Sequence, residues 1–223
     1  MNIMDAKEQF SKISAQYDSQ RRNLIPEFDG FYGAAVDALD LPPNAKVADL
    51  GAGTGIMAAQ VLRRFPDASF ELVDVSDKML ALAKKRFADF AGFSFVLSDF
   101  DSWTPQGEYD AVVSALAIHH IEDSAKLSLY KKIFGALKDG GMFVNAEQVL
   151  GATPEEIKAN YDARLAIVEK FTNADEAAVA LERLKLDKCA TVAENLAMLS
   201  EAGFSECGCV FSHLDFAVLA AKK

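Results

Sequence analysis

Five residues in one short stretch of the chain have the types and spacing of a ligand-binding site: Asp49, Gly51, Gly53, Gly55 and Asp74. The glycines follow a short apolar run, and Asp74 comes 19 residues after the last of them. Glycine lets the backbone turn tightly and approach a ligand without a Cβ atom in between. A helix that begins after such a turn presents unpaired N–H groups and partial positive charge. The stretch therefore predicts a binding corner between a strand and a helix.

The pattern excludes two common kinds of phosphate site. The dinucleotide fingerprint G-x-G-x-x-G requires a small residue at the sixth position, where this chain has Ile56. The Gly-Lys-Ser/Thr that ends a phosphate-binding P-loop does not follow the glycines. Asp49, at the expected strand end, would repel a pyrophosphate and suits a cationic ligand instead.

The segment "VADLGAGTG" resembles motif I of the class I S-adenosylmethionine (SAM) dependent methyltransferases, small-molecule type. The order of expected elements from about Lys46 to the end is similar to that family as well. The resemblance implies that SAM is the cofactor and that S-adenosylhomocysteine is the product. It implies an enzyme that transfers a methyl group by in-line displacement, a reaction in which the protein mainly supplies alignment and exclusion of water.

The resemblance also implies roles for individual residues. Asp49 is expected near the aminoacyl end of SAM. Gly51, Ala52 and Gly53 are expected to allow close backbone approach, within a loop that Gly55 completes. Asp74 is expected to accept hydrogen bonds from both ribose hydroxyls, although an aspartate here also suits the cap of the helix that follows.

Further residues are implied around the adenine and the methyl group. Val75 and Met79 are expected to flank the adenine, and Met79 also suits a core position. Asp99 either accepts from the adenine amino group, with Phe100 beside the ring, or opens a local turn. Ser114 and Ala115 are expected to border the methionine part and the transferred methyl group.

Candidate general bases follow the expected fourth strand, at His119 and His120. Histidine titrates near neutral pH and can take a proton from a hydroxyl or amine, but the pair also suits packing at a helix start. Tyr17 is a further candidate. Together with Arg21 or Arg22 it is expected either to close over the cofactor or to meet an acidic substrate, although all three also suit a solvated helix face. No carboxylate with metal-ligand spacing accompanies the histidines, so we expect no metal site.

The composition narrows the class of partner. Net charge is −10 and the pI is near 4.8, whereas nucleic acid is bound mainly by basic surfaces. Cys189, Cys207 and Cys209 lack zinc-knuckle spacing and are expected to be reduced, mostly buried thiols. The sequence shows no signal segment and no membrane span, so we expect a cytoplasmic protein, as a monomer or homodimer.

The expected fold class is α/β: a Rossmann-like, seven-stranded, mostly parallel sheet with helices on both faces and an antiparallel C-terminal hairpin. We expect one domain over 1–223, with an N-terminal helical cap over 1–43 and a helical insertion over 152–191 placed as a possible lid. Gly140 and Gly141 are expected to cap a helix. The expected elements are strands 46–50, 70–74, 93–98, 109–114, 142–147, 206–211 and 215–220, and helices 4–17, 25–39, 56–65, 77–90 and 124–137, with 153–202 largely helical.

Three functions fit these observations. The leading one is a SAM-dependent methyltransferase with a small-molecule acceptor. A tRNA- or rRNA-modifying methyltransferase is the second, although the chain lacks an "NPPY"-like segment and an overall basic composition. The third is a protein that binds SAM or a modified form of it without turnover. The acceptor atom and the use of a general base are not determined by the sequence.

Overall fold

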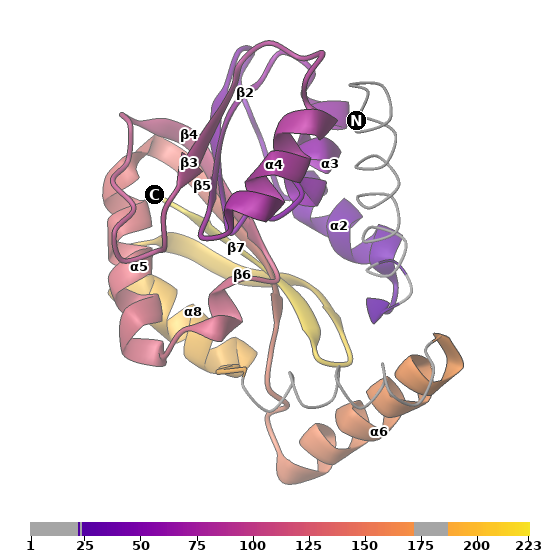
Figure 1. The fold of residues 1–223 in the computed structure, drawn as a ribbon. Helices are drawn as coiled ribbons and strands as arrows, with labels where there is room; N and C mark the ends of the chain where they lie inside the picture. The colour runs from indigo at the N-terminus through magenta and orange to yellow at the C-terminus, as the bar shows by residue number, and fades with distance from the viewer. Residues whose placement is uncertain (1–21, 23, 172–186) are drawn as a thin grey trace.

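The computed structural model describes Arg22, residues 24–171 and residues 187–223 (Figure 1). The predicted helix 4–17 and the central part of the insertion lie outside these residues. The described helices are α2 (Phe28–Asp37), α3 (Ile56–Arg64), α4 (Asp77–Arg86), the 3₁₀ helix η1 (Ile118–His120), α5 (Asp123–Ala136), α6 (Pro154–Phe171) and α8 (Val192–Glu201). The strands are β1 (Lys46–Leu50), β2 (Ser69–Asp74), β3 (Phe93–Leu97), β4 (Tyr109–Ala115), β5 (Leu137–Gln148), β6 (Ser205–His213) and β7 (Phe216–Lys222).

The strands form one seven-stranded sheet in the order β3-β2-β1-β4-β5-β7-β6. The five strands from β3 to β5 are parallel, and β7 pairs antiparallel with β5 and with β6. The predicted fold class is confirmed, including the C-terminal hairpin. The strand order reverses between β1 and β4, and in open α/β sheets a crevice for ligands forms at that point, outside the carboxyl ends of the strands.

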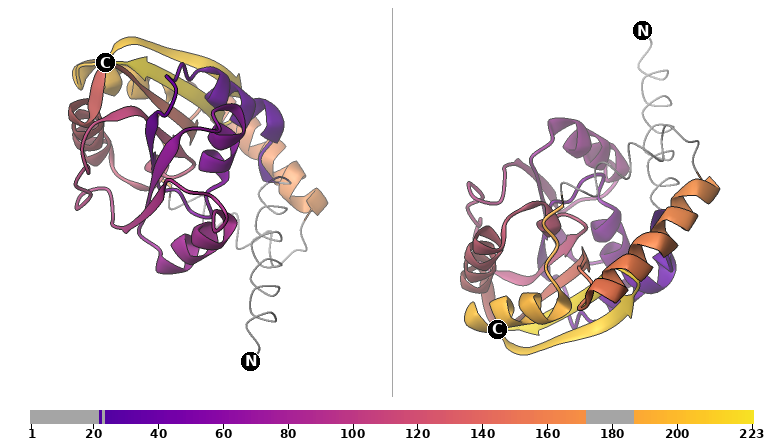
Figure 2. Two further views of the ribbon diagram at one scale, coloured as in Figure 1. Left: turned by 90° about the horizontal axis from the view of Figure 1, so that it is seen from above. Right: turned by 90° about the horizontal axis from the view of Figure 1, so that it is seen from below.

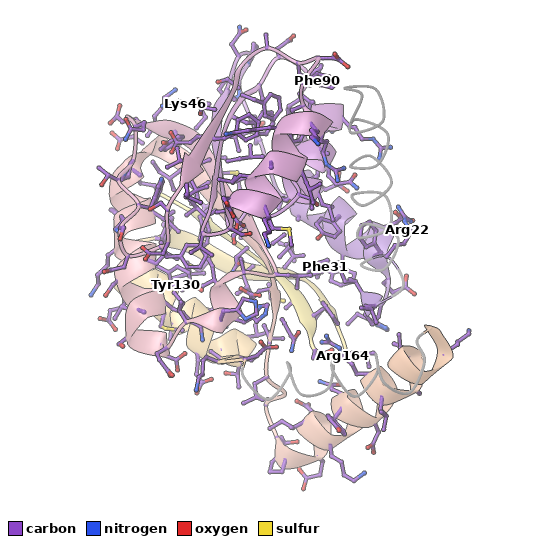
Figure 3. The ribbon with its side chains drawn as sticks, in the orientation of Figure 1. Arg22, Phe31, Lys46, Phe90, Tyr130 and Arg164 are labelled. Atoms are coloured by element: carbon purple, nitrogen blue, oxygen red, sulfur yellow. The ribbon has the colours of Figure 1, made fainter. Side chains whose placement is uncertain are left out.

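Helices cover both faces of the sheet (Figure 2), and an apolar core lies on each face. Neighbouring strand residues point to opposite faces, so Val113 joins the core beneath α2, α3 and α4, and Val112 joins the core beneath α5 and α8. Phe31 of α2 and Tyr130 of α5 are fully buried in these separate cores (Figure 3). Each fully buried large side chain contributes on the order of 1.5–3 kcal/mol to folding. The two cores therefore stabilise the sheet beneath its crevice.

Local signals account for where several helices begin. Ser76 caps α4, since its hydroxyl accepts from the Met79 N–H at 3.3 Å. Thr191 caps α8 in a reciprocal capping box with Glu194. No side chain caps α3, which begins directly after Gly55 in the left-handed conformation. The first turn of α3 is thus placed by the glycine loop.

The predicted role of Gly140 and Gly141 as a helix cap is wrong. Helix α5 ends at Ala136, and both glycines lie inside β5, which is longer than the predicted strand 142–147. The Gly140 N–H donates to the Lys223 carbonyl at 3.2 Å, and the Lys223 N–H donates to the Gly141 carbonyl at 2.9 Å. Pairing with the far end of the chain therefore takes up backbone groups that a helix terminus would leave open.

The cysteines differ from the prediction in their burial. All three are free; Cys189 and Cys207 are half-buried, and Cys209 is exposed. Cys209 lies on β6, an edge strand of the sheet. The edge position leaves part of that strand uncovered, so the expectation of mostly buried thiols is wrong for Cys209.

Helix α6 extends away from the sheet, next to the tip of the β6–β7 hairpin (Figures 1 and 3). Arg164 anchors it: the guanidinium donates to Asp215 Oδ2 at 2.5 Å and lies over the Phe216 ring at 4.7 Å. These contacts are partly buried. Whether this helix closes over a ligand, as a lid would, stays a prediction.

Candidate functional site

A cavity of about 800 Å³ opens at the carboxyl ends of β1, β2 and β4, at the point where the strand order reverses. This volume is in the upper part of the range of small-ligand sites, about 300–1,000 Å³. Eleven predicted site residues line the cavity: Asp49, Gly51, Ala52, Gly53, Asp74, Val75, Met79, Asp99, Phe100, Ala115 and His120. The strand ends thus bring together residues from four separate stretches of sequence.

The three glycines of the loop have positive φ angles, 70° at Gly51, 56° at Gly53 and 81° at Gly55. Their surroundings differ. A Cβ atom at Gly51 would lie 2.2 Å from the Ala117 Cβ, and one at Gly55 would lie 2.5 Å from the Phe87 ring. A Cβ at Gly53 would meet no described residue within 4 Å, although the φ of 56° disfavours a side chain there. Tight packing requires the first and third glycines, while the second faces open space.

Asp74 ties the glycine loop to the end of β2. Its Oδ2 accepts from the Gly53 N–H at 2.8 Å, and its Oδ1 accepts from the Ser76 N–H at 2.8 Å. The carboxylate is half-buried and lines the cavity. Each carboxylate oxygen has a second lone pair, so Asp74 retains acceptor capacity toward a ligand.

Asp49 is fully buried at the end of β1 and also lines the cavity. Its Oδ2 accepts from the Ala58 N–H at 3.1 Å, and its Oδ1 has no hydrogen-bond partner among the described residues. Burial raises the pKa of this carboxyl to about 7, opposed in part by the Ala58 hydrogen bond. An uncompensated buried carboxylate is costly, so a cation in the cavity would stabilise it.

The far end of the cavity follows β3. Asp99 Oδ1 accepts from the Ser102 N–H at 2.7 Å, which lowers the pKa of Asp99. Asp99 therefore opens the predicted turn, and its exposed carboxylate lines the cavity as well. Lys132 holds this loop, since its ammonium donates to the carbonyls of Phe100, Asp101 and Trp103 at 2.6–3.1 Å.

Three predicted site residues that the structure describes do not line the cavity. Gly55 packs against Phe87, and the Ser114 hydroxyl is fully buried and donates to the Leu50 carbonyl at 2.7 Å. His119 is buried behind the cavity wall. Tyr17 lies outside the described residues.

Sequence reasoning missed much of the wall opposite the glycine loop. The missed lining residues are Tyr32, Thr54, Ile56, Met57, Ser98, Asp101, Leu116, Ala117, Ile121, Ser124, Ala125, Ser128, Leu129 and Lys132. Those from Ile121 onward recur every three or four residues through α5, the spacing of one helix face. That periodicity could have indicated that α5 borders the site.

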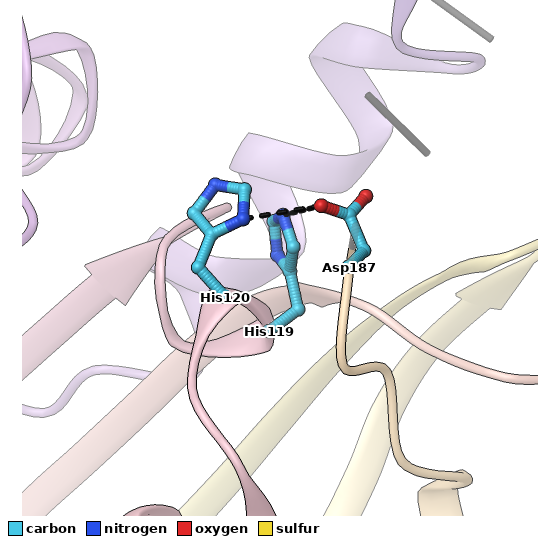
Figure 4. Close-up of side chains that lie close together, drawn as sticks. All are labelled: His119, His120 and Asp187. Carbon is cyan, nitrogen blue, oxygen red and sulfur yellow. Dashed lines mark ion pairs between the residues drawn. The ribbon is translucent and has the colours of Figure 1, made fainter. Parts of the chain in front are cut away.

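The two histidines lie beside a carboxylate that is distant in sequence (Figure 4). Asp187 Oδ1 is 3.1 Å from His120 Nδ1 and 3.8 Å from His119 Nε2. On the opposite side of the His119 ring, Nδ1 is 2.5 Å from Glu147 Oε1. The expectation of no metal site depended on the lack of an accompanying carboxylate, and the fold supplies one.

Comparisons with known proteins agree with this geometry. A family model described as a methyltransferase domain matches residues 47–141. The chain is 28% identical to a malonyl-[acyl-carrier protein] O-methyltransferase of Ilyobacter polytropus, over 79% of this chain and 66% of that protein. It is 26% identical to a carboxy-S-adenosyl-L-methionine synthase of Nautilia profundicola, over 95% of this chain and 92% of that protein.

Among solved structures, human N-acetylserotonin methyltransferase in complex with SAM superposes with a TM-score of 0.62 at 21% identity. The match covers 86% of this chain and 51% of the human one, so this chain spans about half its length. At this identity the likeness concerns the fold. None of the described helices has an apolar stretch long enough to cross a lipid bilayer.

Proposed function

We propose that this chain, which belongs to the class I SAM-dependent methyltransferases, transfers a methyl group from SAM to a small-molecule acceptor. The observation that carries the proposal is the cavity at the switch point of the sheet, where two acidic strand ends flank an open glycine. When bound, SAM supplies an electrophilic methyl group on a sulfonium. The residues of this chain would bind it, orient it and exclude water.

The chemistry of the cavity fits SAM. The unpaired Oδ1 of Asp49 is buried beside the loop and suits the positive charge of the aminoacyl end. Asp74 has acceptor capacity for the ribose hydroxyls, and Gly53 leaves the backbone open to close approach. We propose these three residues as the main contacts to the amino acid part and the sugar.

The adenine would lie at the β3 end of the cavity. Val75 has 73% of its surface exposed and, with Met79, forms one wall. Asp99 and Phe100 lie on the loop that Lys132 holds. We propose that Asp99 accepts from the adenine amino group while it also keeps its turn.

The acceptor would bind where the cavity passes η1 and the start of α5. Ile121 and Ala125 line the cavity there with apolar side chains, and His120 and Ser124 line it with polar ones, a mixture found in sites for compact metabolites. Of the two predicted histidines, His120 faces the cavity and is the one in position to meet the acceptor. The net charge of −10 favours a small molecule over nucleic acid.

The test is turnover of methyl-labelled SAM by the purified chain against a panel of small carboxylic acids, phenols and amines. Formation of S-adenosylhomocysteine together with a labelled small product would support the proposal. Product only with tRNA or rRNA, with binding that weakens steeply in salt, would replace it with a nucleic-acid acceptor. Tight SAM binding without product from any acceptor class would indicate a binding protein.

A second candidate function follows from the relative that matches almost the whole chain, the carboxy-SAM synthase. In this alternative, SAM is the molecule that is modified, and no methyl group reaches an acceptor. Mass spectrometry of the nucleoside products distinguishes the two functions. Methyl transfer converts SAM to its demethylated thioether. Synthase activity would keep the sulfonium and replace one C–H of SAM by a carboxylate from a carboxylic-acid co-substrate, with release of a proton, so the assay includes the small carboxylic acids of the panel.

A further inference from the structure

We propose that His119, His120 and Asp187 form a binding site for one divalent transition-metal ion of the zinc class, at the edge of the methyl-transfer cavity. The three side chains each offer one ligand atom, and these atoms all lie within 4.8 Å of one another. They come from η1 and from the segment that precedes α8 (Figure 4). Two imidazoles and one carboxylate are a donor set that zinc binds readily.

The distances suit a tetrahedral ion. Two ligand atoms that are each about 2.1 Å from such an ion lie roughly 3.3 Å apart. Asp187 Oδ1 is 3.1 Å from His120 Nδ1 and 3.8 Å from His119 Nε2, which bracket that value. Small side-chain movements would therefore place all three atoms at bonding distance.

The strongest support for a metal site is Glu147, which contacts the side of the His119 ring away from Asp187. Glu147 is buried, and its Oε1 lies 2.5 Å from the ring nitrogen Nδ1 of His119. Its Oε2 accepts from the backbone N–H of His119 at 3.0 Å. A carboxylate accepts hydrogen bonds, so Glu147 favours a proton on Nδ1. Nε2 is then the ring nitrogen on the side of Asp187, and it can bind a metal ion. This carboxylate–histidine arrangement is the usual support of a metal-bound imidazole.

His119 Nε2 lies 3.8 Å from the Oδ1 of Asp187. Asp187 has only 9% of its side chain exposed, so water screens this contact poorly. Gln148 Nε2 donates to the other oxygen of Asp187 at 3.4 Å. A cation between the imidazoles and Asp187 Oδ1 would compensate the two nearly buried carboxylates, Glu147 and Asp187.

Backbone contacts hold Asp187 in this position. The Lys188 N–H donates to the His119 carbonyl at 2.6 Å, and the buried Lys126 ammonium donates to the Lys188 carbonyl. The segment that carries the carboxylate is thus tied directly to the histidine turn. Hydrogen bonds between the two segments therefore fix the positions of the cluster residues.

The three protein ligands leave one tetrahedral position open. His120 has 61% of its side chain exposed and lines the cavity, whereas His119 and Asp187 do not line it, so the ion would lie at the edge of the region where the acceptor would bind. If the proposed methyl transfer is correct, an oxygen or nitrogen of the acceptor takes this position. The metal site itself does not depend on that function.

The test is titration of the chelator-treated full chain with Zn²⁺, followed by calorimetry, and with Co²⁺, followed by its visible absorption. We expect one ion per chain, with affinity reduced tenfold or more in His120→Ala and in Asp187→Asn. Glu147→Gln should lose 10- to 100-fold, the range for partners of metal ligands. His120 is exposed and Asp187→Asn conserves shape, so both variants should fold, which circular dichroism checks.

Matched controls are His213→Ala and Asp67→Asn, an exposed histidine and an exposed aspartate outside the cluster. Both should bind the ion as the wild type does. Absence of stoichiometric binding, or equal affinity in the cluster variants and the controls, would overturn the proposal. SAM affinity is measured in parallel, so that a failed metal site and a failed cofactor site give different results.

Discussion

The two ends of the cavity are built in different ways. The part that we propose for the amino acid portion and the ribose of SAM comes from one continuous stretch, since the glycine loop and Asp74 lie on consecutive elements from β1 to β2. The part that we propose for the acceptor has His120 of η1 on its wall, and beside that histidine lies Asp187, 67 residues later in the chain. A site encoded in one local pattern is readable from sequence, whereas one assembled from distant segments emerges only when the chain folds.

The largest expected effect is a loss of SAM affinity on substitution of Gly53, at the proposed cofactor end of the cavity. Gly53→Val places a branched side chain in the open space before the loop, and SAM affinity should fall by about a hundredfold or more. Calorimetry measures the loss, and circular dichroism checks the fold. The control is Gly135→Ala, at a helical position with nothing within 4 Å, where stability should rise by up to about 1 kcal/mol. Normal SAM binding by Gly53→Val would move the site elsewhere.

Gly55→Ala should separate packing from binding within the same loop. A Cβ there clashes with Phe87 at a φ of 81°, so the free energy of unfolding should drop by about 2–4 kcal/mol. Urea denaturation measures this drop. The folded protein should bind SAM almost as the wild type does, and the double variant with Phe87→Leu should show favourable coupling. A large loss of SAM affinity without loss of stability would contradict this division of roles.

Asp74→Ala should weaken SAM binding by roughly 1–3 kcal/mol, because ligand hydroxyls would lose their acceptor in a buried setting. It also removes the anchor of the Gly53 N–H. Asp74→Asn retains one acceptor oxygen and should lose less. Calorimetry measures the SAM affinity of the wild type, Asp74→Asn and Asp74→Ala, which should decrease in that order. Equal affinities would show that Asp74 does not bind the ribose.

The smallest expected effect concerns the pH dependence of stability. Burial raises the pKa of Asp49 to about 7, whereas in the unfolded chain it ionises near pH 4. Between these values the folded state holds one proton more, so the free energy of unfolding falls as the pH rises. From pH 6 to pH 8 the loss should be about 1 kcal/mol.

Asp49→Asn cannot ionise at this position, so its free energy of unfolding should lack the decrease between pH 6 and pH 8 that Asp49 causes. Urea denaturation of wild type and variant at several pH values isolates it, since the other titrating groups are shared. Parallel pH profiles for the two proteins would show that Asp49 ionises normally in the folded chain.

The order of strands and helices was predictable because apolar runs, glycine turns and helix caps are local signals. The positions of Asp49 and Asp74 followed from the same signals. The extension of β5 through Gly140 was not predictable, because its partner is the last residue of the chain. The pairing of His119 with Glu147 and Asp187 likewise depends on contacts between segments that no sequence spacing links.

Because the three loop glycines have different surroundings, their substitution in descendants of this protein would report on different properties. Gly51 and Gly55 are required by Ala117 and Phe87, neighbours that belong to the protein itself. A descendant that had abandoned its cofactor would still be under selection to keep both. Drift at position 53 would therefore be the first sign, in a lineage, that the ancestral ligand is gone.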